Sequence, residues 1–241
     1  MDSPPSLPPD DFATTRWTMV VAAGEKQTPA AQVALAELCQ AYWYPLFAYV
    51  RRRTGEEAAR DLTQAFFAWL LEKNSLAAAD RTRGRFRAFL LTTLKNFLSN
   101  EWEKQRAIKR GGRAATLSLD FDAGDSRLRI EPAAGETPEH FYERQWALAL
   151  LDRVLTQLRD EYTQAGKARQ FESLKPLLTG GGNDHPSIAK ELGWTDNATR
   201  VAAHRLRVRY RELLRSEIAQ TVASADDVEE EIRWLFTVFG G

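Results

Sequence analysis

The sequence predicts an all-α protein built from two small helical domains, with a flexible linker between them and a helix-turn-helix in the second domain. Apolar residues recur at helical intervals through most of the 241 residues, and no clear run alternates as a half-buried strand does. A segment rich in Gly, Pro, Ser and Asp at 113–137 interrupts the helical pattern and indicates a linker. Beyond it, an arginine-rich helix over 196–217 follows a short helix and a glycine.

These patterns divide the chain into five parts. They are a disordered, proline-rich N-terminus at 1–11, a first helical domain at 12–112, the linker at 113–137, a second helical domain at 138–222 and an acidic amphipathic tail at 223–241. Apolar residues make up 44% of the chain, which is enough material for a packed core in each helical domain.

Three long helices are predicted in the first domain. The first covers 30–53 and contains Pro45, where we expect a kink or a break. The second covers 55–74, and two acids at its start favour a helix N-terminus. The third covers 85–112, with apolar residues that recur every three or four positions and form one buried stripe.

The second domain begins with a helix over 137–162, for which Thr137 is the expected cap and Pro138 the first residue. Short helices are predicted over 171–178 and 185–193. The arginine-rich helix then extends to about residue 222, and an amphipathic helix over 225–239 forms the tail.

The helix-turn-helix is predicted from "SIAKELGWTDNATR". Ala189 is small where two helices would cross, and Leu192 is expected to face inward. Gly193 can take the positive φ of a sharp turn. Thr195 or Asp196 would then cap the second helix.

In such motifs the start of the second helix enters the major groove, where Arg and Asn reach base edges and further arginines meet phosphates. The residues that we expect to contact DNA are Asn197, Arg200, His204, Arg205 and Arg209. The plain alternative is a solvated basic helix in an ordinary bundle, since runs of charge usually face solvent.

Charge is unevenly distributed although the formal net charge is zero. Residues 81–113 carry ten basic residues and two acids, whereas 114–143 carry seven acids and two basic residues. The tail over 224–241 carries five acids and one arginine. Basic segments that are separated from acidic ones remain compatible with nucleic-acid binding.

Several other classes of protein are disfavoured. Cys39 is the only cysteine, which excludes a disulfide framework within one chain. Neither a signal peptide nor an apolar run of about 18 residues is present, so we expect a cytoplasmic protein without a membrane partner. The three histidines lack ligand spacing and no nucleophile or phosphate-loop motif occurs, so neither an enzyme nor a cofactor is expected.

Two stretches together resemble bacterial RNA polymerase sigma factors of the extracytoplasmic-function type. Residues 42–106, with "DLTQAFF" and "FRAFL", resemble the family's second region, and residues 171–213, with "IAKELG" and "HR", resemble its fourth region. The resemblance implies a factor that binds core RNA polymerase, melts the downstream promoter element with its first domain and recognises the upstream element with its helix-turn-helix. The alternative is a stand-alone helix-turn-helix regulator that binds duplex DNA without polymerase.

The resemblance also implies roles for residues of the first domain. The helix that resembles the core-binding helix carries Asp61, Gln64, Phe67 and Trp69, although the two aromatic residues can equally belong to the core. The residues implied in binding the downstream element are Asn74, Arg81, Arg87, Lys95, Trp102 and Arg106. The last four fall near one stripe, where charge can follow a single strand and Trp102 can stack on a base or pack inside.

The sequence is compatible with three ways of regulating this factor. The core-binding helix has fewer acids than the family's, and a phosphate added to Thr63 by a Ser/Thr kinase would restore negative charge there, unless Thr63 is an ordinary helix residue. An anti-sigma protein is a second candidate. The acidic tail, finally, either caps its domain or folds over the basic recognition helix and competes with DNA.

Overall fold

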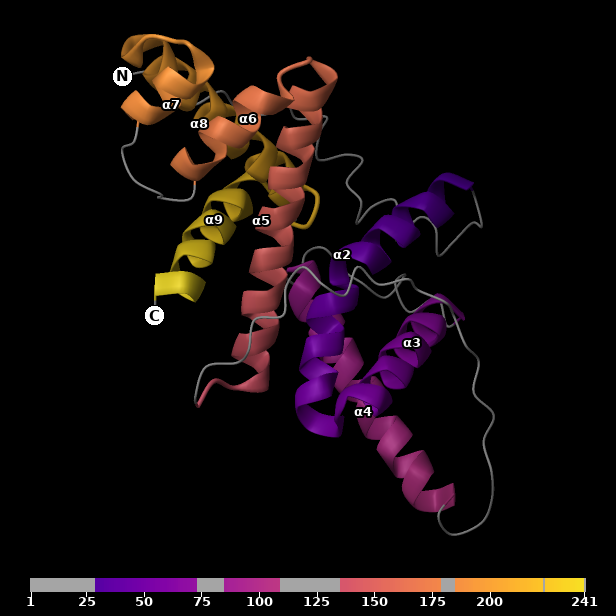
Figure 1. The fold of residues 1–241 in the computed structure, drawn as a ribbon. Helices are drawn as coiled ribbons and strands as arrows, with labels where there is room; N and C mark the ends of the chain where they lie inside the picture. The colour runs from indigo at the N-terminus through magenta and orange to yellow at the C-terminus, as the bar shows by residue number, and fades with distance from the viewer. Residues whose placement is uncertain (1–28, 73–84, 109–134, 179–184, 223, 241) are drawn as a thin grey trace. The chain divides into compact units, whose positions relative to one another are not determined.

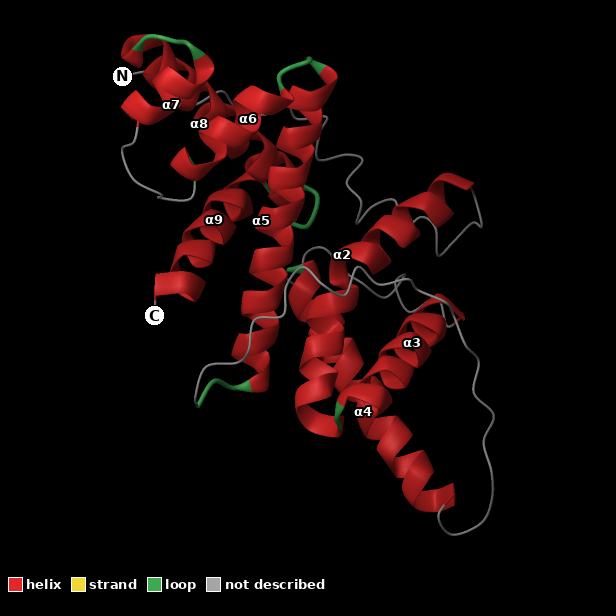
Figure 2. Cartoon of the chain, in the orientation of Figure 1, coloured by secondary structure: helices red, strands yellow, loops and turns green. Residues whose placement is uncertain are grey.

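A computed structural model describes most of the chain as helix (Figure 1). The described residues are 29–72, 85–108, 135–178, 185–222 and 224–240. Within these ranges the regular elements are α-helices and one short 3-10 helix, with no strand, as Figure 2 shows. The prediction of an all-α fold is confirmed, whereas most of the predicted linker and the proline-rich N-terminus lie outside the described residues.

The chain divides into two compact units. One takes in the described parts of Met1–Ala149 together with those of Ile218–Gly241, and the other is Leu150–Glu217. The division differs from the predicted boundaries in two respects that bear on function. Residues 138–149 and 218–222 were predicted in the second domain, but they belong to the first unit. The C-terminal tail belongs to the unit that contains the N-terminal helices and is no appendage of the second unit.

Three helices form most of the first unit: α2 (Pro29–Thr54), α3 (Glu56–Glu72) and α4 (Phe86–Ile108). Pro45 lies inside α2 and does not end it. The core between these helices is largely aromatic, with ring pairs that approach to between 5.4 and 5.7 Å. The pairs are Tyr42–Phe86, Trp43–Phe67 and Phe66–Phe97.

Helix α5 (Pro138–Gln164) begins as predicted. The hydroxyl of Thr137 accepts a hydrogen bond from the amide of His140 (3.1 Å), and this bond caps the helix. In the first turn Glu139 accepts hydrogen bonds from Lys95 (2.8 Å) on α4 and Tyr49 (3.3 Å) on α2. The bond from Lys95 holds the pKa of Glu139 below its ordinary value, and burial raises the pKa of Tyr49 to about 12. The start of α5 is thus fastened to two helices of the first unit.

The second unit contains residues 150–164 of α5 and four further elements: α6 (Ala168–Leu174), the 3-10 helix η4 (Lys175–Leu177), α7 (His185–Leu192) and the greater part of α8 (Asp196–Ala219). Its core is aliphatic with one large aromatic side chain. The buried residues include Val154, Leu158, Phe171, Leu174, Ile188, Ala203 and Leu206.

The chain ends in α9 (Ala225–Gly240), which belongs to the first unit. Val228, Leu235 and Val238 are buried on this helix. Of the apolar residues at helical spacing in the tail, Val228 and Leu235 are thus buried as expected, whereas Phe239 is 45% exposed. No helix among the described residues combines the length and the apolar character that a bilayer crossing requires.

Candidate nucleic-acid interface

A sharp turn joins α7 to α8. Gly193 follows α7 with a φ of 68°, which is the positive value expected from the sequence. The amide of Trp194 donates to the carbonyl oxygen of Ala189 (2.8 Å) and closes the end of α7. Of the two predicted caps, Thr195 is the one in place, because its hydroxyl accepts from the amide of Ala198 (3.2 Å). Leu192 is only half-buried, so its expected inward position is met in part.

The outer face of α8 is basic where the helix begins. Asn197, Arg200, His204 and Arg205 are all exposed. Within the described part of the chain, neither Arg200 nor Arg205 takes part in a hydrogen bond or an ion pair between side chains. Charges that are uncommitted inside the fold keep their full capacity to pair with an external anion.

Two exposed valines share this face and were missed by the sequence reasoning. Val201 and Val208 are 42% and 37% exposed. With Asn197 and His204 they follow a spacing of four, three and four residues, which places them on one stripe of the helix. That spacing is present in the sequence, but apolar residues at helical spacing there predict a buried face, and only the structure exposes them. An exposed valine beside arginines suits contact with a thymine methyl group in the major groove.

Arg209 lies in a different setting from the other predicted DNA contacts. Its guanidinium donates to Glu161 on α5 (2.7 and 2.9 Å) and to Glu212 on its own helix (2.9 Å). These bonds raise the pKa of Arg209, and they lower that of Glu161. Arg209 is exposed, but its donors already have acceptors inside the unit, so it ties α8 to α5.

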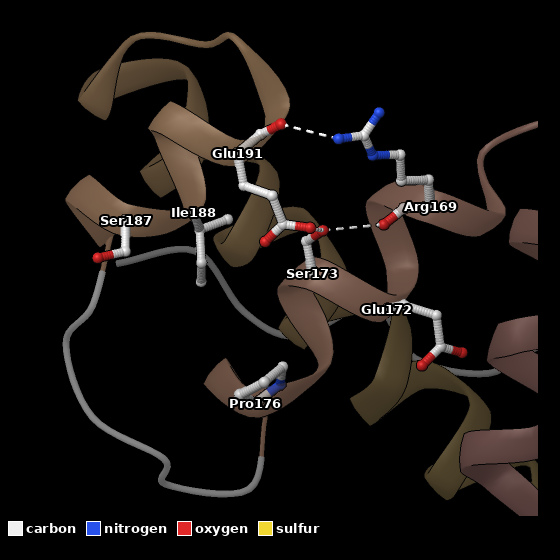
Figure 3. A pocket seen from close by; sticks show the side chains of 7 residues that line it. All are labelled: Arg169, Glu172, Ser173, Pro176, Ser187, Ile188 and Glu191. Atoms are coloured by element: carbon white, nitrogen blue, oxygen red, sulfur yellow. Dashed lines mark hydrogen bonds between the residues drawn. The ribbon is translucent and has the colours of Figure 1, made fainter.

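A shallow pocket of about 380 Å³ separates α6 and η4 from α7 (Figure 3). Three of its lining residues bond to one another: the hydroxyl of Ser173 lies 2.8 Å from a carboxylate oxygen of Glu191, and Arg169 donates to the backbone carbonyl of Glu191 (3.1 Å). Figure 3 shows these side chains bridging the two segments. The pocket is therefore a polar joint that positions α7 against α6.

The residues implied in core binding divide between the surface and the interior of α3. Asp61 is exposed and Gln64 is half-buried. Phe67 is buried and stacks on Trp43, with ring centroids 5.7 Å apart. Trp69 is half-buried against Phe97. Phe67 thus belongs to the core, whereas Asp61, Gln64 and Trp69 each keep part of the side chain at the surface.

The burial of Thr63 contradicts the hypothesis that this residue is phosphorylated. Its side chain is completely buried, and the hydroxyl donates to the backbone carbonyl of Ala59 (2.7 Å). A kinase cannot reach this oxygen in the folded unit, and a phosphate would place about two negative charges inside an aromatic core. Thr63 is an ordinary helix residue that satisfies its hydroxyl one turn back.

The expected stripe for single-stranded DNA on α4 is only partly available. Asn74 and Arg81 lie outside the described residues, as does the side chain of Arg106. Lys95 is paired with Glu139 (2.8 Å), and Trp102 is half-buried. None of these residues therefore stands out as an uncommitted DNA contact in the described chain.

Arg87 departs most from the prediction, because it is only 4% exposed. Its guanidinium carbon lies 3.6 Å from the ring centre of Trp234 and 4.9 Å from that of Trp146. It pairs with Glu231 of α9, which is also buried. Burial lowers the pKa of Arg87 to about 10, which still leaves it charged at neutral pH. The basic side chain expected on the surface of α4 is thus enclosed by the C-terminal tail.

The tail occupies a place that neither interpretation of the sequence had assigned to it. It caps the first unit, where Arg85 adds a second cation to Glu231 (2.7 Å). The amide of Phe86 also donates to the carbonyl oxygen of Thr221, just before the tail (3.5 Å). Opposite charge on α4 and α9 was visible in the sequence, but their pairing across more than 140 residues was not.

Comparisons of this chain with protein-family models, with curated proteins and with solved structures found no match.

Proposed function

We propose that this chain is a sigma factor of the extracytoplasmic-function type, which binds core RNA polymerase and directs promoter-specific initiation. In this proposal α7, the turn at Gly193 and α8 are a helix-turn-helix. The observation that carries it is the exposed face of Asn197, Arg200, His204 and Arg205 at the capped start of α8. A helix that enters the major groove presents such a face near its N-terminus.

The first unit supports the second part of the proposal. Asp61 and Gln64 lie one turn apart on α3, with Asp61 exposed, and they can hydrogen-bond a basic helix of the polymerase. The proposed contacts to the melted strand belong to α4 and the residues before it. A promoter-specificity subunit uses both surfaces, and it works only in complex with the enzyme that carries it.

A specific observation keeps the stand-alone regulator as a second candidate. Arg87 is covered by α9, whereas Arg200 and Arg205 are exposed on α8, and duplex binding through α8 alone needs nothing from the first unit. Such a regulator would bind paired half-sites as a dimer, whereas a sigma factor would bind polymerase as a single copy.

Mixing the purified chain with core polymerase and separating the mixture by size exclusion distinguishes the two candidates. Co-elution followed by initiation at a defined promoter is expected. Arg200→Ala and Arg205→Ala should each weaken recognition of the upstream element by about 1–3 kcal/mol if they bond to bases. Arg159→Ala is the matched control, because it removes an exposed arginine of the same unit that lies on α5.

Two outcomes would contradict the sigma-factor proposal. If the chain never co-elutes with core polymerase but binds duplex DNA as a dimer, the stand-alone regulator replaces it. If both arginine variants retain the selectivity of the unsubstituted chain, then the α8 face is a solvated helix surface.

A further inference from the structure

Three side chains of the first unit form a small cationic and aromatic site, here called the Arg87 cradle. It consists of Arg85 and Arg87 at the start of α4 and Trp146 on α5. The hydroxyl of Tyr142 donates to the backbone carbonyl of Arg87 (3.0 Å) and fixes the start of α4 against α5. The cradle is therefore built from two helices that are held together independently of α9.

Helix α9 fills the cradle with one anion and one flat ring. The carboxylate of Glu231 pairs with both arginines, and the indole of Trp234 lies on the guanidinium of Arg87 at 3.6 Å. The guanidinium carbon also lies 4.9 Å from the ring centre of Trp146, and the two indole rings are themselves in contact, with their centres 5.7 Å apart. Glu230 adds a second carboxylate 3.8 Å from Arg85.

The anion of Glu231 and the ring of Trp234 correspond to the phosphate and the base of a nucleotide. A phosphate accepts hydrogen bonds from arginines as a carboxylate does, and it takes a forked guanidinium in the same way. A base stacks on an indole or on a guanidinium plane, and each such contact contributes about 1–3 kcal/mol in single-strand binding. Glu231 and Trp234, three residues apart on one helix, present an anion and a ring to the site together.

We propose that the Arg87 cradle is a binding subsite for one nucleotide of single-stranded DNA, which α9 occupies as an intramolecular mimic. The phosphate would take the place of the Glu231 carboxylate, and the base would take that of the Trp234 ring. The strand and α9 then exclude one another. This inference rests on the proposed function. It would give α4 the contact to the single strand that Arg87 cannot make while α9 covers it.

The ion pair between Arg87 and Glu231 opposes exchange only weakly when another anion takes the place of the carboxylate. A buried ion pair loses much of its Coulomb attraction to the cost of removing both charges from water, so its net contribution to stability is small. A phosphate that replaced Glu231 would restore a partner to Arg87 and return the carboxylate to solvent. Helix α9 is also buried on one face only, and Phe236 remains 75% exposed on the other. The contacts that would be lost are chiefly those of Val228, Leu235 and Val238.

The full-length chain allows a direct test with a fluorescently labelled single-stranded DNA of about twelve nucleotides. Glu231→Gln removes the anion that competes for the cradle, and we expect it to raise affinity for the oligonucleotide at least tenfold, because less of the chain is held in the closed state. Asp226→Asn is the control, because it removes one negative charge from the exposed side of the same helix. It should change affinity less than twofold.

The double variant Arg87→Ala/Glu231→Gln identifies the cradle as the source of the gain, and its affinity should return to that of the unsubstituted chain. Equal affinity of the Glu231→Gln and Asp226→Asn chains, with circular dichroism showing both folded, would overturn the inference. So would a gain that persists in the double variant.

A second measurement on the unsubstituted chain covers the case in which Glu231→Gln unfolds. Saturating oligonucleotide should accelerate amide hydrogen exchange over residues 225–240, because displaced α9 loses its packing. Unchanged exchange there at saturation would also overturn the inference. A chain that co-elutes with polymerase and selects a promoter, yet fails both tests, keeps the proposed function and loses only the mimic.

Discussion

At the scale of single residues, burial decides which polar groups can act on a partner. Thr63 and Gln64 are neighbours on α3, yet Thr63 is completely buried and Gln64 is half-buried. The helix turns by about 100° per residue, so adjacent positions face different surroundings. Arg87 and Arg200 show the same contrast between two arginines, one buried beside two indole rings and one open to solvent.

A negative charge at position 63 should unfold the first unit and should not strengthen its attraction to polymerase. Thr63→Glu places an unpaired carboxylate among aromatic side chains, and we expect a loss of several kcal/mol in the free energy of unfolding, measured with urea. Gln64→Glu is the matched control and should cost less than about 1 kcal/mol. A folded Thr63→Glu chain with higher affinity for core polymerase would revive the phosphorylation hypothesis.

At the scale of elements, helix ends and turns set the direction of the helices that carry the charges. The turn between α7 and α8 depends on a positive φ at Gly193 and on the Thr195 cap. Nothing lies within 4 Å of the place where a Cβ on Gly193 would be. The cost of a side chain there is therefore one of backbone conformation alone, without a steric clash.

Gly193→Ala should lower the free energy of unfolding of the second unit by about 1–2 kcal/mol, because a residue with a Cβ is strained at this φ. Gly193→Asn should lose clearly less, since asparagine tolerates the left-handed region. Urea denaturation of the three chains measures both values. Equal losses for alanine and asparagine would mean that the turn depends on something other than its backbone conformation.

At the scale of the whole molecule, the distribution of charge matters more than its sum. The formal net charge is zero, but many cations already have acids as partners within their own unit, as Arg87 does with Glu231 and Arg209 with Glu161. What remains for an external anion is the set that has no such partner in the described chain, with Arg200 and Arg205 foremost. The capacity to bind DNA thus depends on which pairs form inside the fold.

The salt dependence of DNA binding measures how many of these cations are available to phosphates. Affinity for duplex DNA that contains the upstream element should fall with salt concentration despite the zero net charge, since bound phosphates release counterions. If Arg200 contacts a phosphate, Arg200→Ala should reduce the slope of log affinity against log salt by about one. Arg209→Ala should leave the slope almost unchanged because Glu161 and Glu212 already occupy its donors. A larger change for Arg209 than for Arg200 would reverse the assignment of the two residues.

Local sequence was sufficient for the position of the α-helices and for several of their caps. The α-helices lie where they were predicted, although α6 and the 3-10 helix η4 replace the single helix expected over 171–178. Thr137, Gly193 and Thr195 take the cap and turn roles expected of them. These features depend on residues within a few positions of one another, where backbone geometry and hydrogen bonding are set by neighbours along the chain. For the same reason, the exposed start of α8 could be anticipated as a candidate site.

The sequence by itself determined that this chain is helical and where its cationic helices begin. Only the tertiary structure decided which cations remain open, because the partners of Arg87 and Arg209 come from distant helices. A charge pattern says that Glu231 can pair with an arginine, but not with which one. The pairing with Arg87 follows from tertiary packing, because the burial of Val228, Leu235 and Val238 within the first unit brings Glu231 next to Arg87.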